Sequence, residues 1–107
     1  MPTSSLNPRI VDRPQEEQER VDRETSRLAL YYHEGCVFCI RVLRVIERLH
    51  LKIDFRNIRE VPAYRDQLVE QGGSSTVPCL QIRRDDGEME WLYESHQIID
   101  YLEKRFA

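Results

Sequence analysis

Two cysteines three positions apart, Cys36 and Cys39, are the residues of this chain best suited to covalent chemistry. They follow a short apolar and aromatic stretch, Leu28–Tyr32, and open a segment of helical character that runs to about His50. The first N–H groups of a helix lack intrahelical partners and the helix dipole favours negative charge there, which would stabilise a thiolate at Cys36. The thiolate is the reactive form of cysteine, and Cys39, one turn further on, could close a disulfide with the same sulfur. The spacing therefore indicates a redox-active dithiol.

Composition limits the other kinds of chemistry. A chain of 107 residues suffices for one domain with a real core, and three cysteines are too few for a disulfide framework. The net charge of −3 argues against a nucleic-acid or membrane partner. No apolar run follows Met1 and no stretch approaches transmembrane length. We therefore expect a cytoplasmic monomer, in which a C-x-x-C pair is catalytic or metal-binding.

The pattern beyond the cysteines predicts an α/β fold. We expect strands over Leu28–Tyr32, Lys52–Ile58, Thr76–Ile82 and Met89–Tyr93, and helices over residues 37–49, over residues 62–71 and from an N-cap at Ser95. An Asp-Gly turn at residues 84–87 joins the last two strands as a hairpin. The order β-α-β-α-β-β-α predicts one mixed four-stranded sheet with helices on both faces.

The first 27 residues differ from the rest. Five arginines and six acidic residues fall between Arg9 and Arg27, with almost nothing large and apolar among them. A helix starting at Pro14 would have only Val21 to bury. We therefore divide the chain into a charged extension, residues 1–27, helical or partly disordered, and a folded domain, residues 28–107.

Pro78 is the second informative position. A proline inside a strand cannot donate to the ladder, so residues 76–78 must lie at an edge, a bulge or a turn. A cis bond between Val77 and Pro78 would turn the backbone so that Val77 presents its N–H and C=O beside the sheet. Only about 5–6% of X–Pro bonds in folded proteins are cis, so the proline alone does not establish this.

These motifs together resemble those of the thioredoxin-fold glutaredoxins, and in particular atypical members similar to the N-terminal domain of glutathione S-transferases. The pieces that carry the resemblance are Tyr31-Tyr32 ahead of Cys36-Val37-Phe38-Cys39, then Thr76-Val77-Pro78, then the segment Tyr93 to Leu102. They cover the last 80 residues in the order of the family. The chain departs from the common Cys-Pro-Tyr-Cys form, because Val37 replaces the proline and Phe38 the tyrosine.

The resemblance implies a glutathione site and an activity. The backbone of Val77, the residue before Pro78, would pair with the cysteinyl part of glutathione, Glu94 and Ser95 would receive its γ-glutamyl group, and Pro78 and Phe38 would also belong to the glutathione site. The glycine carboxylate needs a cation, for which Arg59 is the first candidate and Arg56 the second. The implied reaction is reduction of protein–glutathione mixed disulfides and of disulfides, with Cys36 as nucleophile, Cys39 as resolving thiol and glutathione as reductant. No metal is expected.

Three alternatives stay open. The domain could be a non-catalytic thioredoxin-fold module that holds glutathione or an iron–sulfur cluster. His33, Cys36, Cys39 and Cys79 could together form a zinc site, although the cysteines run straight into an apolar-striped helix. A thioredoxin-like enzyme reduced by a flavoprotein is the third, and the pair Glu94-Ser95 argues against it. Cys79 by itself reads as a small buried hydrophobic residue.

Overall fold

The computed structural model describes residues 12–107. Its elements, in chain order, are α1 (Gln15–Thr25), β1 (Leu28–Tyr32), α2 (Val37–Arg48), β2 (Asp54–Asn57), α3 (Pro62–Gln67), the π-helical segment η2 (Leu68–Gly72), β3 (Cys79–Arg83), β4 (Met89–Leu92) and α4 (Ser95–Phe106). The strands form one sheet in the order β2-β1-β3-β4. β1 runs parallel to β2 and antiparallel to β3, and β3 is antiparallel to β4. This is the mixed four-stranded sheet that the sequence predicts.

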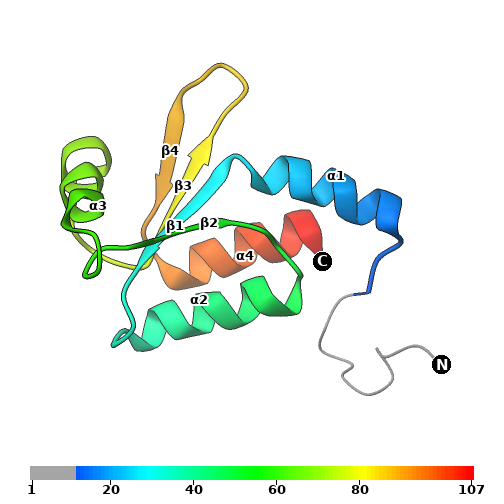
Figure 1. Cartoon of the computed structure of the whole chain (residues 1–107), viewed down its shortest axis with the longest axis horizontal. Helices are drawn as coiled ribbons and strands as arrows, with labels where there is room; N and C mark the ends of the chain where they lie inside the picture. The colour runs from blue at the N-terminus through cyan, green and yellow to red at the C-terminus, as the bar shows by residue number, and fades with distance from the viewer. Residues whose placement is uncertain (1–11) are drawn as a thin grey trace.

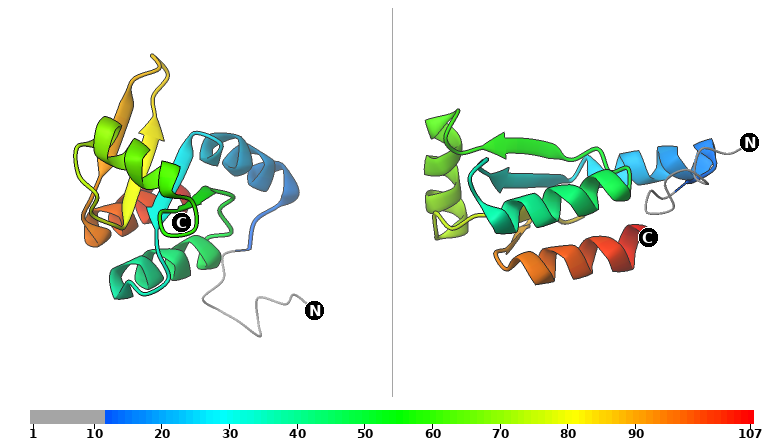
Figure 2. Two further views of the ribbon diagram at one scale, coloured as in Figure 1. Left: turned by 60° about the vertical axis from the view of Figure 1, so that its left-hand side comes forward. Right: turned by 90° about the horizontal axis from the view of Figure 1, so that it is seen from below.

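The sheet is covered on both faces, which explains why β1 reads as a continuous apolar run. α2 and α4 lie side by side on one face, and α3 covers the other face at one end of the sheet (Figure 1; Figure 2). Leu28 and Leu30 belong to the core between the sheet and α2 and α4. Ala29 and Tyr31 alternate with them and pack with Leu68 in the smaller core beneath α3. The predicted thioredoxin-like architecture, with helices on both faces, is therefore confirmed.

The charged segment ahead of the sheet is helical and packed on the domain. α1 contributes Val21, which is 4% exposed, to the core of the α2 and α4 face. Arg13, just before α1, donates hydrogen bonds to the backbone carbonyl oxygens of Leu49 and Phe106, at the C-terminal ends of α2 and α4. The sequence anticipates the helix and the burial of Val21, but not these contacts. Residues 1–11 of the extension lie outside the described residues, and the boundary at residue 28 stays a prediction.

Three predicted boundaries need correction. The strand expected over residues 76–82 begins only at Cys79, because Pro78, which has no N–H, precedes the ladder instead of interrupting it. The strand expected over residues 52–58 is shortened to Asp54–Asn57. Ser95 is the first residue of α4 and not its N-cap, a position that Glu94 occupies without a side-chain hydrogen bond.

The turns that the glycines predict are present. Gly73, with φ of 94°, follows the segment that began as α3 and continued as η2. Gly87, with φ of 88°, closes the β3–β4 hairpin and donates its N–H to the carbonyl of Arg84. Such φ values lie in the left-handed region that glycine adopts without steric cost. Gly72 has a different role, since a Cβ there would overlap with the Tyr93 hydroxyl. Its missing side chain lets η2 approach the sheet closely.

Candidate active site

Cys36 occupies the N-cap position of α2, at the end of the loop that leaves β1. Its Sγ accepts a hydrogen bond from the backbone N–H of Cys39 at 3.2 Å. The sulfur therefore takes the place that a side-chain oxygen takes in an ordinary N-cap and satisfies one of the free N–H donors of the helix. The side chain is half-buried, so the sulfur combines a fixed position with access from outside.

Cys39 differs from Cys36 in its burial. It lies within the first turns of α2, is completely buried, and forms no disulfide. Burial raises the pKa of its thiol to about 12, with a further contribution from its hydrogen bond to Cys36 and an opposing one from the backbone of His33. Near neutral pH this thiol is therefore protonated. The two sulfurs differ in exposure, and of the two only Cys36 is accessible from outside.

The segment before β3 meets Cys36. The Val77–Pro78 peptide bond is cis, and the carbonyl oxygen of Val77 lies 3.8 Å from the Sγ of Cys36, close enough to accept a weak hydrogen bond from the thiol. Residues separated by 41 positions are thus in contact at the candidate nucleophile. A thiol or disulfide that approaches Cys36 from this side would meet the main chain of Val77.

Glu94 and Ser95 lie at the start of α4. The two helices on this face of the sheet begin at the same end, so the first turn of α4 lies at the Cys36 end of the molecule (Figure 1; Figure 2). The Glu94 carbonyl accepts the N–H of Ile98 at 3.0 Å, while its side chain makes no capping bond. The first N–H groups of α4 therefore have no side-chain cap at Glu94, and such groups attract a carboxylate.

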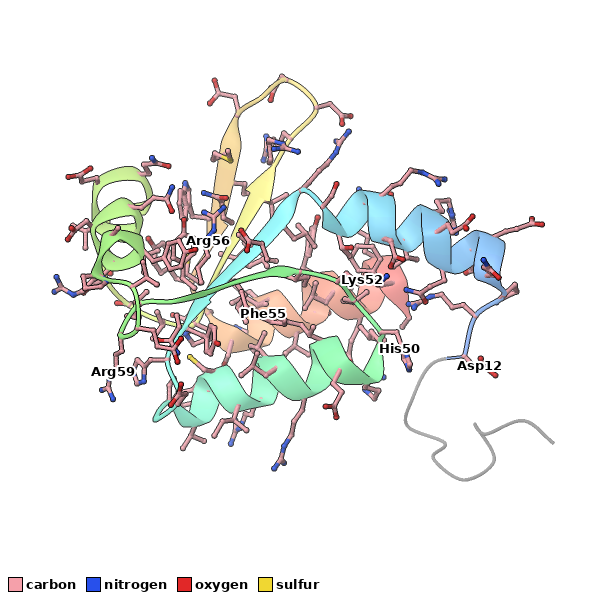
Figure 3. The ribbon with its side chains drawn as sticks, viewed as in Figure 1. Asp12, His50, Lys52, Phe55, Arg56 and Arg59 are labelled. Atoms are coloured by element: carbon pink, nitrogen blue, oxygen red, sulfur yellow. The ribbon has the colours of Figure 1, made fainter. Side chains whose placement is uncertain are left out.

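The two candidate cations have different surroundings (Figure 3). Arg59 reaches the loop ahead of Cys36, because a Cβ placed on Gly35 would lie 3.7 Å from an Nη atom of Arg59. Arg56 instead bonds the Tyr31 hydroxyl at 2.6 Å and pairs with Asp54 on the face that α3 covers. The structure therefore places Arg59 beside Gly35, the residue before Cys36, and leaves Arg56 paired with Asp54 and Tyr31.

Phe38 is 54% exposed on the first turn of α2. The guanidinium of Arg41 lies 5.4 Å from the centroid of its ring, a cation–π contact on the helix surface. An exposed aromatic ring two residues after the candidate nucleophile offers an apolar surface to whatever reaches Cys36. The contact of Phe38 with glutathione that the resemblance implies stays a prediction.

Asn57 is a residue of this site that the sequence analysis missed. It is 5% exposed at the end of β2, and its Oδ1 accepts the backbone N–H groups of Arg59 and Glu60 at 2.9 and 3.1 Å. Its Nδ2 donates to the carboxylate of Glu34 at 3.2 Å. One buried amide therefore ties the loop before Cys36 to the loop that carries Arg59. In the sequence, Asn57 is marked only as a polar residue at the end of an alternating strand, and that pattern is too common to identify a site residue.

Cys79 follows Pro78 and is fully buried, as the sequence predicts. Burial raises the pKa of its thiol to about 12, and a hydrogen bond with the Tyr93 hydroxyl acts against that shift. Within residues 12–107, no three or more His, Cys, Asp or Glu side chains are grouped so that they could hold a metal ion. The geometry of the described residues therefore gives the zinc alternative no support.

A sequence model of the glutathione S-transferase N-terminal domain matches residues 30–107. The sheet order, the helices on both faces and the C-x-x-C loop define a thioredoxin-fold protein with a cysteine site at a helix N-terminus. Within that class, the chain belongs to the family of glutathione S-transferase N-terminal domains. No curated protein sequence matches it.

Solved structures agree with this assignment. The chain is 26% identical to a maleylacetoacetate isomerase from Anaeromyxobacter dehalogenans solved with dicarboxyethyl glutathione and citrate in the active site, with a TM-score of 0.57 over 74% of this chain and 36% of that one. It is 28% identical to glutathione transferase E6 from Drosophila melanogaster, with a TM-score of 0.58 over 75% of this chain and 35% of that one. It thus spans about a third of the length of these two proteins.

A third neighbour bears on the fold alone. The thioredoxin-like protein BC3987 is 18% identical, with a TM-score of 0.55 over 68% of this chain and 96% of that one. This chain therefore matches almost the entire length of that thioredoxin-like protein.

No helix between residues 12 and 107 has the length and apolar character needed to cross a membrane.

Proposed function

We propose that this protein is a glutathione-dependent thiol–disulfide oxidoreductase of the glutaredoxin type. The observation that carries the proposal is the position of Cys36, whose half-exposed sulfur accepts an N–H at the start of α2 and lies 3.8 Å from the Val77 carbonyl. The similar maleylacetoacetate isomerase from Anaeromyxobacter dehalogenans has been solved with glutathione and with dicarboxyethyl glutathione in its active site. A reactive sulfur in a glutathione-binding fold suits exchange of glutathione between thiols.

In this proposal glutathione extends from Cys36 toward the start of α4. The main chain of Val77, beside Pro78, would pair with the cysteinyl residue of glutathione. The first N–H groups of α4 and the Ser95 hydroxyl would bind the γ-glutamyl carboxylate, and Glu94 would pair with its ammonium group. Arg59 would bind the glycine carboxylate at the other end of the tripeptide.

The reaction consists of two exchanges. The Cys36 thiolate attacks the glutathione sulfur of a protein–glutathione mixed disulfide, the S–S bond breaks, and the protein leaves as a thiolate that takes up a proton. A Cys36–glutathione disulfide remains. The thiolate of a second glutathione attacks the glutathione sulfur of that disulfide, which forms oxidised glutathione and returns Cys36 as a thiolate. Glutathione is thus the reductant, and the enzyme returns to its starting state.

The buried thiol of Cys39 favours this route over one that closes an internal disulfide. To attack Cys36, Cys39 must first lose its proton, and burial holds its pKa at about 12. The thiolate fraction of Cys39 near neutral pH is therefore very small. Cys39 then serves chiefly through its backbone N–H, which fixes the sulfur of Cys36.

We further propose that the protein works as a cytoplasmic monomer on glutathionylated and disulfide-containing proteins, without nucleic-acid or membrane partners. The net charge of −3 and the three unpaired thiols suit this setting. The alternative of a non-catalytic module that holds glutathione or an iron–sulfur cluster makes a different prediction, because such a module would show no turnover.

The test is glutathione-coupled reduction of a small glutathione mixed disulfide by the wild type and matched cysteine variants. Cys36→Ser should lose activity by roughly a thousandfold or more, because it removes the nucleophile. Cys39→Ser should stay within several-fold of the wild type, and Cys79→Ala should serve as the control for loss of a buried thiol. Full activity in Cys36→Ser would refute the nucleophile, and glutathione binding without turnover in the wild type would favour the non-catalytic module.

A further inference from the structure

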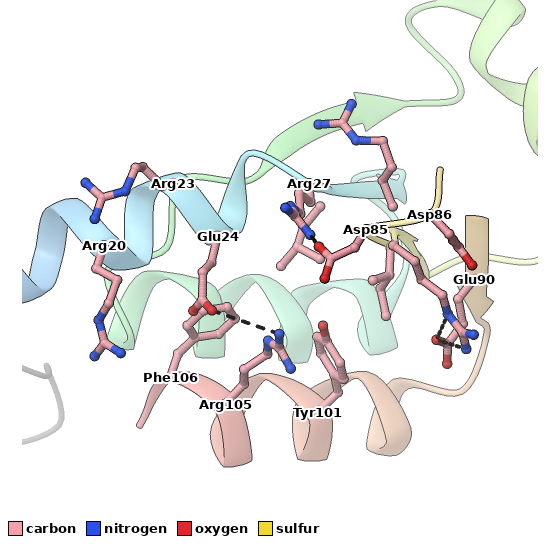
Figure 4. A pocket seen from close by; sticks show the side chains of 14 residues that line it. Arg20, Arg23, Glu24, Arg27, Asp85, Asp86, Glu90, Tyr101, Arg105 and Phe106 are labelled. Atoms are coloured by element: carbon pink, nitrogen blue, oxygen red, sulfur yellow. Dashed lines mark hydrogen bonds and ion pairs between the residues drawn. The ribbon is translucent and has the colours of Figure 1, made fainter. Parts of the chain in front are cut away.

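A large pocket lies away from Cys36, at the opposite end of α4. It is bounded by α1 and the turn after it, by the β3–β4 hairpin and by the last turns of α4 (Figure 4). Its volume is about 820 Å³, which falls in the range of small-molecule sites. Tyr101, Arg105 and Phe106 line it, whereas Glu94 and Ser95 lie at the other end of the same helix. The proposed glutathione chemistry makes no use of this pocket.

Arginine dominates the polar lining. Six arginines line the pocket, together with four carboxylates and no lysine: Arg20, Arg23, Arg27, Arg83, Arg84 and Arg105, against Glu24, Asp85, Asp86 and Glu90. The lining therefore has more positive than negative side chains, although the chain as a whole has a net charge of −3. Arginine presents a planar fork of N–H donors that matches the oxygens of a phosphate in a bidentate way.

Two of these arginines are already engaged by carboxylates. Arg27 forms a close ion pair with Asp85, across from α1 to the hairpin, and Arg84 pairs with Glu90 at 2.7 Å within the hairpin. These pairs connect the walls of the pocket and leave few donors for a ligand. They account for two of the four carboxylates in the lining.

The other arginines keep donors free. Arg20 and Arg105 have only distant carboxylate contacts, at 3.8 Å to Glu17 and 3.9 Å to Glu24. Figure 4 shows Arg20 reaching from α1 toward α4, with the Glu24 carboxylate between Arg20 and Arg105. Among residues 12–107, Arg23 and Arg83 form no ion pair, and residues 1–11 contain no acidic side chain. The pocket therefore offers unfilled guanidinium donors on more than one wall.

The remaining lining is apolar. Leu28, Ile82 and Phe106 reach the pocket from the main core, and Tyr101 adds a half-buried aromatic ring. Leu28, Ile82 and Phe106 are only 3%, 7% and 4% exposed, so Tyr101 supplies the accessible apolar surface. An inorganic anion would use the arginines and leave the Tyr101 ring exposed to water. A ligand with an anionic head and a small apolar or aromatic body would use both parts.

We propose that this pocket binds a small organic phosphate monoester, whose phosphoryl group lies between Arg20 and Arg105 and whose organic part contacts Tyr101. Glu24 occupies part of the same space and acts as an internal competitor for Arg105. The walls that supply Arg20, Arg23 and Arg27 lie before residue 30, where the match to the family model begins. The site thus combines residues of this chain's N-terminal segment with Tyr101 and Arg105 of the family domain.

The test is direct binding of phenyl phosphate to the full chain by isothermal titration calorimetry. Inorganic phosphate and phenol serve as the two half-ligands. Phenyl phosphate should bind saturably and about tenfold more tightly than inorganic phosphate, because it also covers the apolar surface, and phenol should not bind measurably. Affinity should fall as sodium chloride is added. Absence of saturable phenyl phosphate binding would overturn the proposal.

Matched variants locate the site. Arg20→Gln with Arg105→Gln should weaken phenyl phosphate binding at least tenfold. Arg44→Gln with Arg65→Gln, which changes the charge equally on exposed surfaces of α2 and α3, should leave it within twofold. An equal loss in both double variants would mean that binding follows only the overall charge, and would refute the site.

A third variant changes affinity in the opposite direction. Glu24→Gln should tighten phenyl phosphate binding several-fold, since it removes the competing carboxylate and keeps a side chain of the same size. Weaker binding in this variant would contradict the proposed role of Glu24. Reduction of the mixed disulfide at Cys36 should be unaffected in all these variants, so failure of this site and failure of the proposed oxidoreductase are separate results.

Discussion

The two ends of α4 differ in how they are built. At its first turn the candidate site is assembled largely from main-chain groups: the N–H of Cys39, the carbonyl of Val77 and the free N–H groups of α4 itself. At its last turns the arginine pocket is assembled from long charged side chains of α1, the hairpin and α4. The comparison teaches that this domain fixes the sulfur of Cys36 through main-chain groups. A second surface, the arginine pocket, depends on side-chain charge.

The largest expected difference between the thiols is one of reactivity. At pH 7.5, iodoacetamide should alkylate Cys36 at least about a hundredfold faster than Cys39 or Cys79, because burial raises the pKa of both other thiols to about 12. Mass spectrometry of the digested protein at timed intervals measures the three rates. In the denatured protein, the control, all three should react at similar rates. Rapid labelling of Cys39 in the folded protein would contradict the expected difference in reactivity between Cys36 and Cys39.

Asn57→Ala should disturb the sulfur end most among the substitutions that spare the cysteines. It leaves the N–H groups of Arg59 and Glu60 and the Glu34 carboxylate without their buried partner, so we expect a loss of about 2 kcal/mol in the free energy of unfolding. Urea denaturation measures it. In the coupled assay, KM for glutathione should rise several-fold with little change in kcat.

Asn57→Asp combined with Glu34→Gln is the matched control, since it keeps the acceptor for Arg59 and Glu60 and avoids a second carboxylate facing Glu34. It should recover part of the glutathione affinity that Asn57→Ala loses. Equal KM values for the two variants would mean that Arg59 is not held through this amide.

Arg13→Ala tests how firmly the N-terminal segment belongs to the domain. Its guanidinium bonds the Leu49 carbonyl at 2.6 Å and also the carbonyl of Phe106, so it satisfies the free ends of two helices. We expect a loss of about 1–2 kcal/mol in the free energy of unfolding, measured with urea. Arg20→Ala, which removes an exposed arginine from the same segment, should cost less than about 0.5 kcal/mol. If both variants cost the same small amount, α1 would be only loosely attached.

The last expected effect is a loss of stability at alkaline pH, which is divided between two thiols. The two buried thiols have a folded-state pKa of about 12, above the ordinary value of 9.0, so they stay protonated in the folded chain and ionise first in the unfolded one. Their contribution to stability is fully present below pH 9 and falls as pH rises toward 12, by about 1 kcal/mol per pH unit for each thiol. Denaturation at pH 8.5 and 10 measures the slope, and Cys79→Ala should reduce it. A flat profile would contradict the raised pKa values.

The sequence was sufficient for features that depend on neighbours in the chain. The position of Cys36 at a helix start, the burial of Cys79 and the Gly87 turn follow from local patterns, and the structure has each of them. The first strand was predicted with its observed bounds because both faces of β1 are buried and its residues are uniformly apolar. Pro78 was placed inside a strand because a sequence pattern does not show at which residue the ladder begins.

Contacts between distant residues could not be predicted. Arg13 meets Leu49 and Phe106 across 36 and 93 positions, and nothing in a charged N-terminal segment distinguishes it from its neighbours. Arg59 and Arg56 were ranked by position alone, and only the folded chain shows that Arg56 is held by Tyr31 and Asp54. Such outcomes depend on where the sheet and the helices bring side chains together, which a linear pattern does not contain.

The shared amide at the end of β2 has a consequence for how this site could change over evolutionary time. Because one side chain holds both the approach to the sulfur and the support of the candidate carboxylate-binding arginine, the two loops cannot shift independently. A mutation that changes the shape of one loop to admit a bulkier substrate should therefore also change the affinity of the proposed site for glutathione. New specificity is then easier to acquire through Phe38 or other exposed side chains than through either loop.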